Sequence, residues 1–496
     1  MINNKTNKKM RRLLTIFVFI SMYALSYAQY STLDRFNSHK GIDVLIRTDY
    51  SRTYFVTYEG QTSSSNCRFI VQHNDTTRYM NLLQNYENSL PNPMQGFEIK
   101  DMRIIGQECY FCGCKWVETG NIIYNLDGTM TFERKREGII GRFDVRNVIR
   151  NGGSYEIMEI DTVRCLNKLA VLSGRALAVG TLYDGYTPCL FYLREVYYSS
   201  GETDYNYRVI TSNISGETFS DVTASDNKFI VVSRYNTLAG TTQYKYRFGL
   251  RYGTGYNFFS TNTGIYDYNI QNVLGNEGAS FVTMEPALIT STKTDDEVVV
   301  GYINRKLSNR QGMPIFYKIP YSGSNISKIL VALEYGDVKY NKLKEIQYNN
   351  KLVSTSRMVV LLEDSYGNSV LRFPDWNIVE NWYDTALYTS SYKLQSIAPF
   401  QYLSSSLELL TAGYEPNNQN RVVQLFTYDI HGYKGKWATL SCIPYSKKTI
   451  EEIRNFNAPV TSVESPLNNY FLKSHILFTQ VSFTPQNTSE SNICNN

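Results

Sequence analysis

The sequence predicts an all-β protein. Three observations point to this class: residues that favour strands are abundant, with 41 tyrosines and 24 phenylalanines, helical periodicity is scarce, and a short hairpin-forming unit recurs along the chain. One stretch departs from this pattern, because Thr449 can cap a turn of helix over residues 447–455. We therefore expect strands throughout, with one short helix near the C-terminus.

The recurring unit begins with two or three apolar residues that lead into a small residue, which we call the anchor. The anchors are Thr57, Gly113, Gly180, Ser233, Gly301, Leu361 and Gly413. All are Gly, Ser or Thr except Leu361. A polar turn and a second β-rich run follow each anchor, which is the signature of a hairpin.

Anchors at intervals of roughly 59 residues fit units of four strands repeated around an axis. Seven units predict a seven-bladed β-propeller, in which a small anchor lets neighbouring backbones approach near a narrow channel. A β-sandwich or a two-domain all-β fold is the alternative. The repeats fade near residue 433. We therefore divide the chain into a signal peptide over residues 1–28, a seven-repeat propeller over 29–432 and a C-terminal closing segment over 433–496. Within the closing segment, residues 470–483 are a candidate ring-closing strand.

At the level of these repeats, residues 45–432 resemble exported β-propeller-like proteins of unknown function from Gram-negative bacteria. The chain has no Trp-Asp dipeptide of the WD40 type, no Gly-Gly pair that recurs with the repeats as in kelch proteins and no Asp-box of the sialidase type. The resemblance implies a propeller-like fold, and it carries over no catalytic residue.

The first 28 residues read as a cleavable export signal. Five basic residues between Lys5 and Arg12 precede an apolar run from Leu13 to Leu25, and small residues around Ala28 place the cleavage before Gln29. The apolar run is short for a bilayer, and no later stretch is longer, so no membrane span is expected after cleavage. We predict an exported protein of the periplasm or the cell surface.

Export also changes the charge of the chain. The formal net charge of +5 equals the five basic residues of the signal, which contains no acidic residue. The remaining chain is therefore neutral, without the basic surface that a nucleic-acid partner requires.

Common catalytic and cofactor motifs are absent from the sequence, including H-E-x-x-H, a phosphate-binding Gly-rich loop and a G-x-S-x-G elbow. We therefore expect no catalytic residues, no metal and no cofactor. Cys109, Cys112 and Cys114 have a metal-like or redox-like spacing, but alternation along a strand places Cys109 on the opposite face from the other two. We interpret them as buried structural thiols, and a disulfide between Cys442 and Cys494 stays open.

Acidic residues give the sharpest candidate for a ligand site. Glu59, Glu363 and Glu415 each stand two positions after an anchor, and Asp364 lies beside the second. If the ring closes, their three repeats are neighbours, so these carboxylates can gather on one face and bind a cation or sugar hydroxyls. The alternative interpretation is that they are solvated acids at hairpin ends.

Aromatic residues after the sixth anchor form a second candidate surface. Trp376, Trp382 and Tyr383 can stack on a sugar or anchor a protein, or they can pack between blades. The sequence favours a non-catalytic binding or scaffolding protein with a glycan or protein partner. A carbohydrate-active enzyme that uses the clustered carboxylates, and a structural component of a surface complex, are the alternatives.

Overall fold

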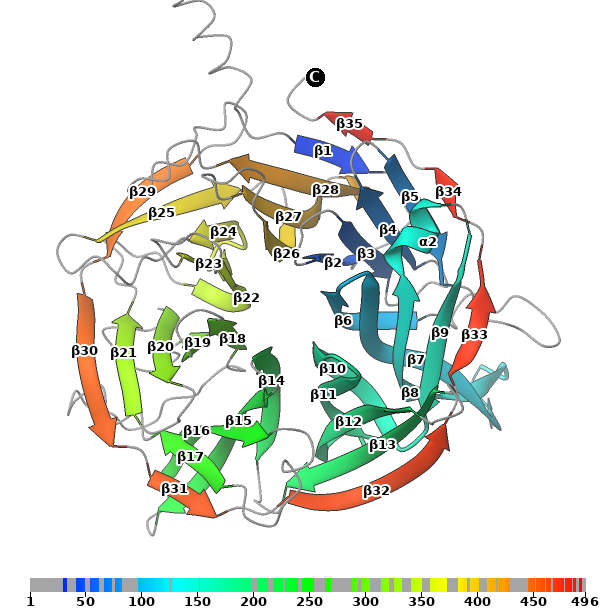
Figure 1. Ribbon diagram of the computed structural model, residues 1–496, viewed down its shortest axis with the longest axis horizontal. Coiled ribbons are helices and arrows are strands. Elements are labelled where there is room, and N and C mark those ends of the chain that lie inside the picture. The colour runs from blue at the N-terminus through cyan, green and yellow to red at the C-terminus, as the bar shows by residue number, and fades with distance from the viewer. Residues whose placement is uncertain are drawn as a thin grey trace, which may run out of the picture.

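The protein is a nearly all-β molecule whose sheets form a propeller-like ring in the computed structural model (Figure 1). The structure describes residues 30–33, 42–49, 54–61, 67–73, 76–82, 97–124, 127–150, 152–197, 203–212, 217–225, 228–239, 243–253, 264–268, 288–292, 297–303, 314–320, 325–331, 340–349, 357–372, 382–389, 393–400, 408–415, 418–428, 445–450, 452–459, 461–464, 467–476, 478–483, 485–487 and 490–492. The described strands form seven five-stranded antiparallel sheets. The predicted export signal, Cys442 and Cys494 lie outside the described residues.

Most sheets take four consecutive strands from the chain. The first three sheets contain β2 (Ile42–Thr48), β3 (Phe55–Gln61), β4 (Arg68–His73) and β5 (Thr76–Asn81); β6 (Phe97–Ile105), β7 (Glu108–Tyr124), β8 (Met130–Asp144) and β9 (Ser154–Ile160); and β10 (Val163–Leu172), β11 (Arg175–Leu182), β12 (Pro188–Tyr197) and β13 (Thr203–Ser212). The next three contain β14 (Thr218–Ser225), β15 (Lys228–Ala239), β16 (Gln243–Gly253) and β17 (Gly264–Tyr268); β18 (Leu288–Thr292), β19 (Glu297–Ile303), β20 (Pro314–Pro320) and β21 (Asn325–Val331); and β22 (Tyr340–Asn349), β23 (Arg357–Asp364), β24 (Ser369–Arg372) and β25 (Trp382–Thr389). A single described helix, α2 (Val145–Ile149), follows β8.

The last sheet joins the two ends of the chain. Its first three strands are β26 (Lys393–Phe400), β27 (Glu408–Glu415) and β28 (Asn418–Tyr428), and its fourth is β1 (Tyr30–Leu33) from the N-terminus. β1 pairs antiparallel with β28, with Tyr30 opposite Leu425. The N-terminal strand therefore closes the ring by completing the last sheet.

The C-terminal segment forms a belt around the ring (Figure 1). Its strands are β29 (Tyr445–Ile450), β30 (Glu452–Pro459), β31 (Thr461–Glu464), β32 (Leu467–Ile476), β33 (Thr479–Ser482), β34 (Gln486–Asn487) and β35 (Glu490–Asn492). Each pairs with the outer strand of a different sheet, in the order β25, β21, β17, β13, β9, β5 and β1. The belt thus visits the sheets in reverse chain order and covers each outer edge, which would otherwise present unpaired backbone groups.

Two expectations for this segment are corrected. The helix expected over 447–455 is replaced by parts of β29 and β30, because pairing with β25 and β21 satisfies the backbone that a helix would have satisfied internally. The candidate ring-closing stretch 470–483 lies instead in β32 and β33, on the third and second sheets.

The first strands of the sheets surround the centre of the ring. β2, β6, β10, β14, β18, β22 and β26 contact one another in this order, and β26 contacts β2. Apolar clusters fill the spaces between neighbouring sheets, as where Phe69 of β4 packs against Phe111 of β7 with ring centroids 5.1 Å apart. Neighbouring sheets cover both faces of the inner strands, which explains fully buried runs such as Val298, Val299 and Val300 of β19.

Each predicted anchor lies on the second strand of its sheet, and the register explains the one anchor that is not a small residue. Gly113, Gly180 and Gly413 lie opposite Ile99, Leu166 and Leu394, the residues that precede an irregularity in the first strand. In the sixth sheet the corresponding pair is Leu343 and Leu362. The structural anchor is therefore Leu362, one position after the Leu361 that the sequence pattern selected.

The anchors are small for a local reason. A Cβ atom on Gly113, Gly180 or Gly413 would lie 2.0–2.2 Å from the carbonyl oxygen of Glu98, Cys165 or Lys393. Each of these carbonyls belongs to the first strand of the same sheet, just before the strand irregularity. The backbone that approaches the anchor is therefore its partner strand.

Candidate functional site

Glu59, the first predicted ligand residue, has its partner within its own sheet. It lies on β3, fully buried, and forms an ion pair with Arg68, which stands directly opposite on β4. The Arg68 guanidinium in turn lies 4.6 Å from the ring centre of Tyr79. A buried carboxylate requires such a partner, so we interpret the ion pair between Glu59 and Arg68 as part of the sheet interior.

Asp364 and Glu363 have separate roles. Asp364 is 2% exposed and accepts hydrogen bonds from the backbone N–H groups of Tyr366 (2.9 Å) and Asn368 (2.8 Å), which fixes the turn between β23 and β24. Glu363 is partly exposed and pairs with Lys344 of β22 at 2.9 Å. Because the structural anchor is Leu362, the residue equivalent to Glu59 is Asp364, and its carboxylate is engaged by the turn.

The other predicted site residues are placed only by their backbone. Glu415 ends β27, and Trp382 and Tyr383 begin β25, where they stand opposite Ile450 and Thr449 of the belt. The structure does not describe the side chains of these three residues, and Trp376 lies outside the described residues. The two buried carboxylates, Glu59 and Asp364, each have partners within their own sheets. A ligand site shared by the predicted acids therefore stays a hypothesis.

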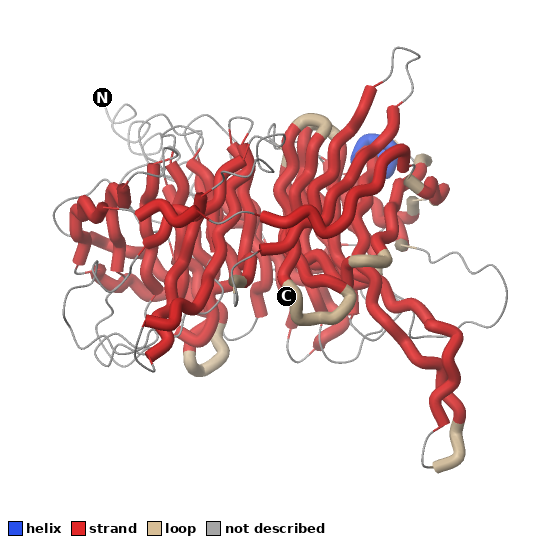
Figure 2. The backbone as a smooth tube through the Cα atoms, turned by 90° about the horizontal axis from the view of Figure 1, so that it is seen from below, coloured by secondary structure: helices blue, strands red, loops and turns tan. Residues whose placement is uncertain are grey.

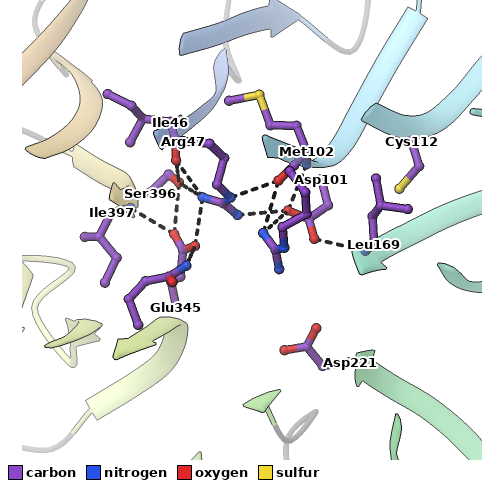
Figure 3. Close-up of polar contacts among 12 residues, drawn as sticks. Ile46, Arg47, Asp101, Met102, Cys112, Leu169, Asp221, Glu345, Ser396 and Ile397 are labelled. Carbon is purple, nitrogen blue, oxygen red and sulfur yellow. Dashed lines mark hydrogen bonds and ion pairs between the residues drawn. The ribbon is translucent and has the colours of Figure 1, made fainter. Parts of the chain in front are cut away.

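A different cluster of charged residues lies at the centre of the ring (Figure 3). Its central member is Arg47 of β2, which is 7% exposed. The Arg47 guanidinium forms ion pairs with Asp101 of β6 and Glu345 of β22, both at 2.8 Å. It also donates to the hydroxyl of Ser396 on β26 at 2.8 Å and to the carbonyl of Met102 at 3.0 Å. One side chain therefore connects four sheets.

The two carboxylates of this cluster repeat one contact. Asp101 accepts a hydrogen bond at 3.0 Å from the backbone N–H of Leu169, on the first strand of the next sheet. Glu345 accepts one at 2.9 Å from the backbone N–H of Ile397, again on the next first strand. In both cases the carboxylate is the first paired residue after the irregularity of its own strand, and the donor is the second paired residue after the equivalent irregularity of the next first strand. The repeated geometry joins each sheet to its neighbour.

The charges of the cluster stabilise one another. Burial alone would lower the pKa of Arg47, but Glu345 and Asp101 outweigh it and hold the pKa above its usual value. Burial would raise the pKa of Asp101, but Arg103 and Arg47 hold it below its usual value. Both groups are therefore ionised at neutral pH. The cluster therefore joins sheets through buried, paired charges.

A second group of charges lines the same first strands. Asp43 of β2 lies near Lys100 and Glu98 of β6, and burial, opposed by Lys100, raises the pKa of Asp43. Lys344 lies beside Glu363, and burial lowers the pKa of Lys344. Perturbed groups of this kind occur both in ion networks and at functional sites. Within the described part of the chain, no group of three or more His, Cys, Asp or Glu side chains has a metal-binding arrangement.

Sequence reasoning missed the central cluster because its members are far apart in the chain and unlike one another. Arg47, Asp101, Glu345 and Ser396 stand on four different first strands. Each lies opposite the residue just before a structural anchor: Val56, Cys112, Leu361 and Ala412. Alignment of the repeats on their first strands would have placed these polar residues in one column.

Comparison with known proteins adds little to this description. No family model and no curated protein sequence matches the chain. Among solved structures, a Trypanosoma rangeli sialidase in complex with sialic acid matches at a TM-score of 0.38 and 7% identity, over 80% of this chain and 56% of the sialidase chain. The Dos1 propeller matches at a TM-score of 0.36 and 10% identity, over 82% and 97% of the two chains. The class of the protein, a propeller-like ring of sheets, rests on its own topology.

Proposed function

We propose that this chain is an exported seven-bladed β-propeller that acts as a binding or scaffolding protein and contacts a protein partner. Seven blades are supported by the seven five-stranded sheets of the described strands and by the circle of contacts among their first strands. In this proposal residues 29–432 form the propeller, and the segment 433–496 supplies the belt. Residues 1–28 direct export, so the mature chain begins at Gln29.

The observation that carries the binding role is a projecting hairpin. β7 and β8 are long strands that remain paired out to Tyr124 and Met130, and β7 changes from buried to exposed along its length. Figure 2 shows one such hairpin reaching well beyond the ring. At its end Ile122, Ile123, Tyr124 and Met130 are between 46% and 74% exposed.

The chemistry of this hairpin end favours a protein over a glycan. Sugar sites combine aromatic faces with hydrogen-bonding side chains, whereas three of these four side chains are aliphatic or thioether groups. Along the stem, Arg134 pairs with Glu118, Lys135 with Glu137 and Arg136 with Glu98. These ion pairs balance most of the stem charges, while Glu133 accepts hydrogen bonds from Thr119 and Asn121. The exposed apolar side chains at the end are the distinguishing feature of the hairpin surface.

Crosslinking tests the partner. A photoreactive amino acid in place of Tyr124 is expected to give specific protein adducts in intact cells, whereas the same group in place of Tyr186, a tyrosine on another turn that is even more exposed, is not. The substitutions Ile122→Asp and Ile123→Asp should abolish the adducts without loss of the fold, because both residues are half-exposed and stand outside the apolar clusters of the ring. Equal labelling from both positions would contradict the proposal. Glycan-array binding that depends on Tyr124 would replace the protein partner with a glycan.

Export is tested independently by sequencing the N-terminus of the protein recovered from the cell envelope or the medium. A chain that begins at Gln29 supports export, and a chain that begins at Met1 contradicts it.

A further inference from the structure

Two cysteines from neighbouring sheets meet in the interior. Cys114 lies on β7, next to the anchor Gly113, and Cys165 lies on β10, the first strand of the next sheet. Their sulfur atoms are 2.7 Å apart. Two unbonded sulfur atoms do not normally rest this close together, and a disulfide bond is about 2.05 Å long.

The other described cysteines behave differently. Cys109 and Cys112 contact only backbone carbonyls through their sulfur atoms, at 4.0 Å and 3.8 Å, and they pack in separate apolar clusters on the two faces of β7. Cys67 and Cys189 are likewise members of apolar clusters. Among the six described cysteines, only Cys114 and Cys165 form a sulfur–sulfur contact.

We propose that Cys114 and Cys165 form a disulfide that links the second and third sheets when the chain folds in the presence of a disulfide donor. In the cell this rests on the proposed export, since oxidising compartments supply such donors and the cytosol does not. The bond revises the interpretation of all these cysteines as structural thiols, and it is distinct from the open pairing of Cys442 with Cys494.

The chemistry is thiol–disulfide exchange. The thiolate of one cysteine attacks a low-molecular-weight or enzyme disulfide and forms a mixed disulfide with release of one donor thiol. The second cysteine then displaces the other donor thiol, so that one bond joins the two protein sulfurs and the donor is reduced to two thiols. In the folded chain both residues are buried, with Cys114 0% and Cys165 6% exposed. The bond therefore forms before the second and third sheets close over it.

Burial also protects the completed bond. Cys114 and Cys165 lie beneath the contact between β7 and β10, and the Cys114 sulfur is 3.5 Å from the carboxylate of Glu98. The hydrogen bond with Cys165 and burial both raise the pKa of the Cys114 thiol, so the reduced pair is slow to react once folded. A reducing agent should therefore act mainly on the unfolded chain.

Peptide mapping tests the bond directly. The chain is denatured and refolded with a mixture of reduced and oxidised glutathione, alkylated without reduction and digested with trypsin. We expect the peptide 104–115 to be linked to the short peptide 165–168, with a loss of two hydrogens. Because 104–115 contains three cysteines, the substitution Cys112→Ala should leave the link intact, whereas Cys114→Ala should release Cys165 for alkylation.

Full alkylation of Cys165 in the refolded wild-type chain would overturn the proposal, whatever the variants do. Peptide mapping of the protein purified from cells distinguishes a failure of the disulfide from a failure of export. If the link forms with glutathione while the cellular chain begins at Met1 and carries free thiols, the disulfide stands and export fails. Reductant present during heating should lower the melting temperature of the wild type and leave that of the Cys114→Ala/Cys165→Ala variant unchanged.

Discussion

The substitution Arg47→Met is the most direct test of the central cluster. Methionine keeps much of the length of the arginine side chain and removes its charge. The variant leaves Asp101 and Glu345 buried without the cation that lies 2.8 Å from each. It also removes hydrogen-bond donors from Ser396 and from the carbonyl of Met102.

The expected loss follows from what remains. Removal of one partner from a buried ion pair costs about 3–5 kcal/mol of unfolding free energy. Here Asp101 keeps Arg103 at 3.0 Å and the N–H of Leu169, and Glu345 keeps the hydroxyl of Ser396 at 2.9 Å. These partners place the expected loss at the lower end, about 3 kcal/mol.

Two further variants make the measurement specific. The triple variant Arg47→Met, Asp101→Asn and Glu345→Gln removes the buried charges together, so it should recover most of the loss. Lys135→Met serves as the matched control, because Lys135 is half-exposed and pairs with Glu137 at 2.7 Å. The control should cost less than about 1 kcal/mol.

The assay is urea unfolding followed by both tryptophan fluorescence and circular dichroism, because coincidence of the two transitions supports the use of one unfolding free energy. A loss for Arg47→Met no larger than that for Lys135→Met would refute the argument that the central cluster joins the sheets. A triple variant less stable than Arg47→Met would refute the argument that buried carboxylates without a cation cause the loss of stability.

Two further predictions concern an anchor and the effect of pH. Gly113→Ala should lower the unfolding free energy by about 1–3 kcal/mol, because the new Cβ would meet the carbonyl oxygen of Glu98 at 2.0 Å. Gly152→Ala is the matched control: its new Cβ would meet no atom within 4 Å, so it should change the unfolding free energy by less than about 0.5 kcal/mol. Equal urea midpoints for the two variants would contradict this. For Asp101, a folded pKa below the ordinary value of 3.8 means that its stabilisation is complete above that value and is lost as pH falls through the folded pKa. The stability difference between wild type and Asp101→Asn should therefore shrink between pH 5 and about pH 3, and a difference that is constant across this range would exclude the linkage.

Several features of the fold were predictable because they depend on short stretches of sequence. The hairpin pattern around anchors such as Gly113 and Gly180 identified the second strand of each sheet, since β-branched and aromatic residues favour strands and turn residues separate them. Alternation along β7 placed Cys109 and Cys112 on opposite faces, and the apolar clusters confirm this. The glycines at the anchors were recognised as close approaches, although the backbone they meet is that of the partner strand.

The candidate site was less predictable because a site depends on which side chains face one another across sheets. Equal spacing from an anchor suggested Glu59 and Glu363 as equivalents, but the strand register makes Leu362 the anchor of the sixth sheet in place of Leu361, so Asp364 is the equivalent of Glu59. Each carboxylate also finds a partner that spacing cannot show: Arg68 for Glu59 and the turn at Tyr366 for Asp364.

The sequence by itself determined the class of the protein, since strand propensity and hairpin turns are local properties of the chain. Only the tertiary structure decided where the last strands go, because a strand with no turn to a neighbour pairs with whichever edge is free and within reach. Tyr445–Ile450 lies on β25 and Leu467–Ile476 on β13, and no local pattern distinguishes these edges from the others. The belt and the Arg47 cluster share one physical cause: both are contacts between segments far apart in the sequence, and they exist only once the sheets stand in a ring.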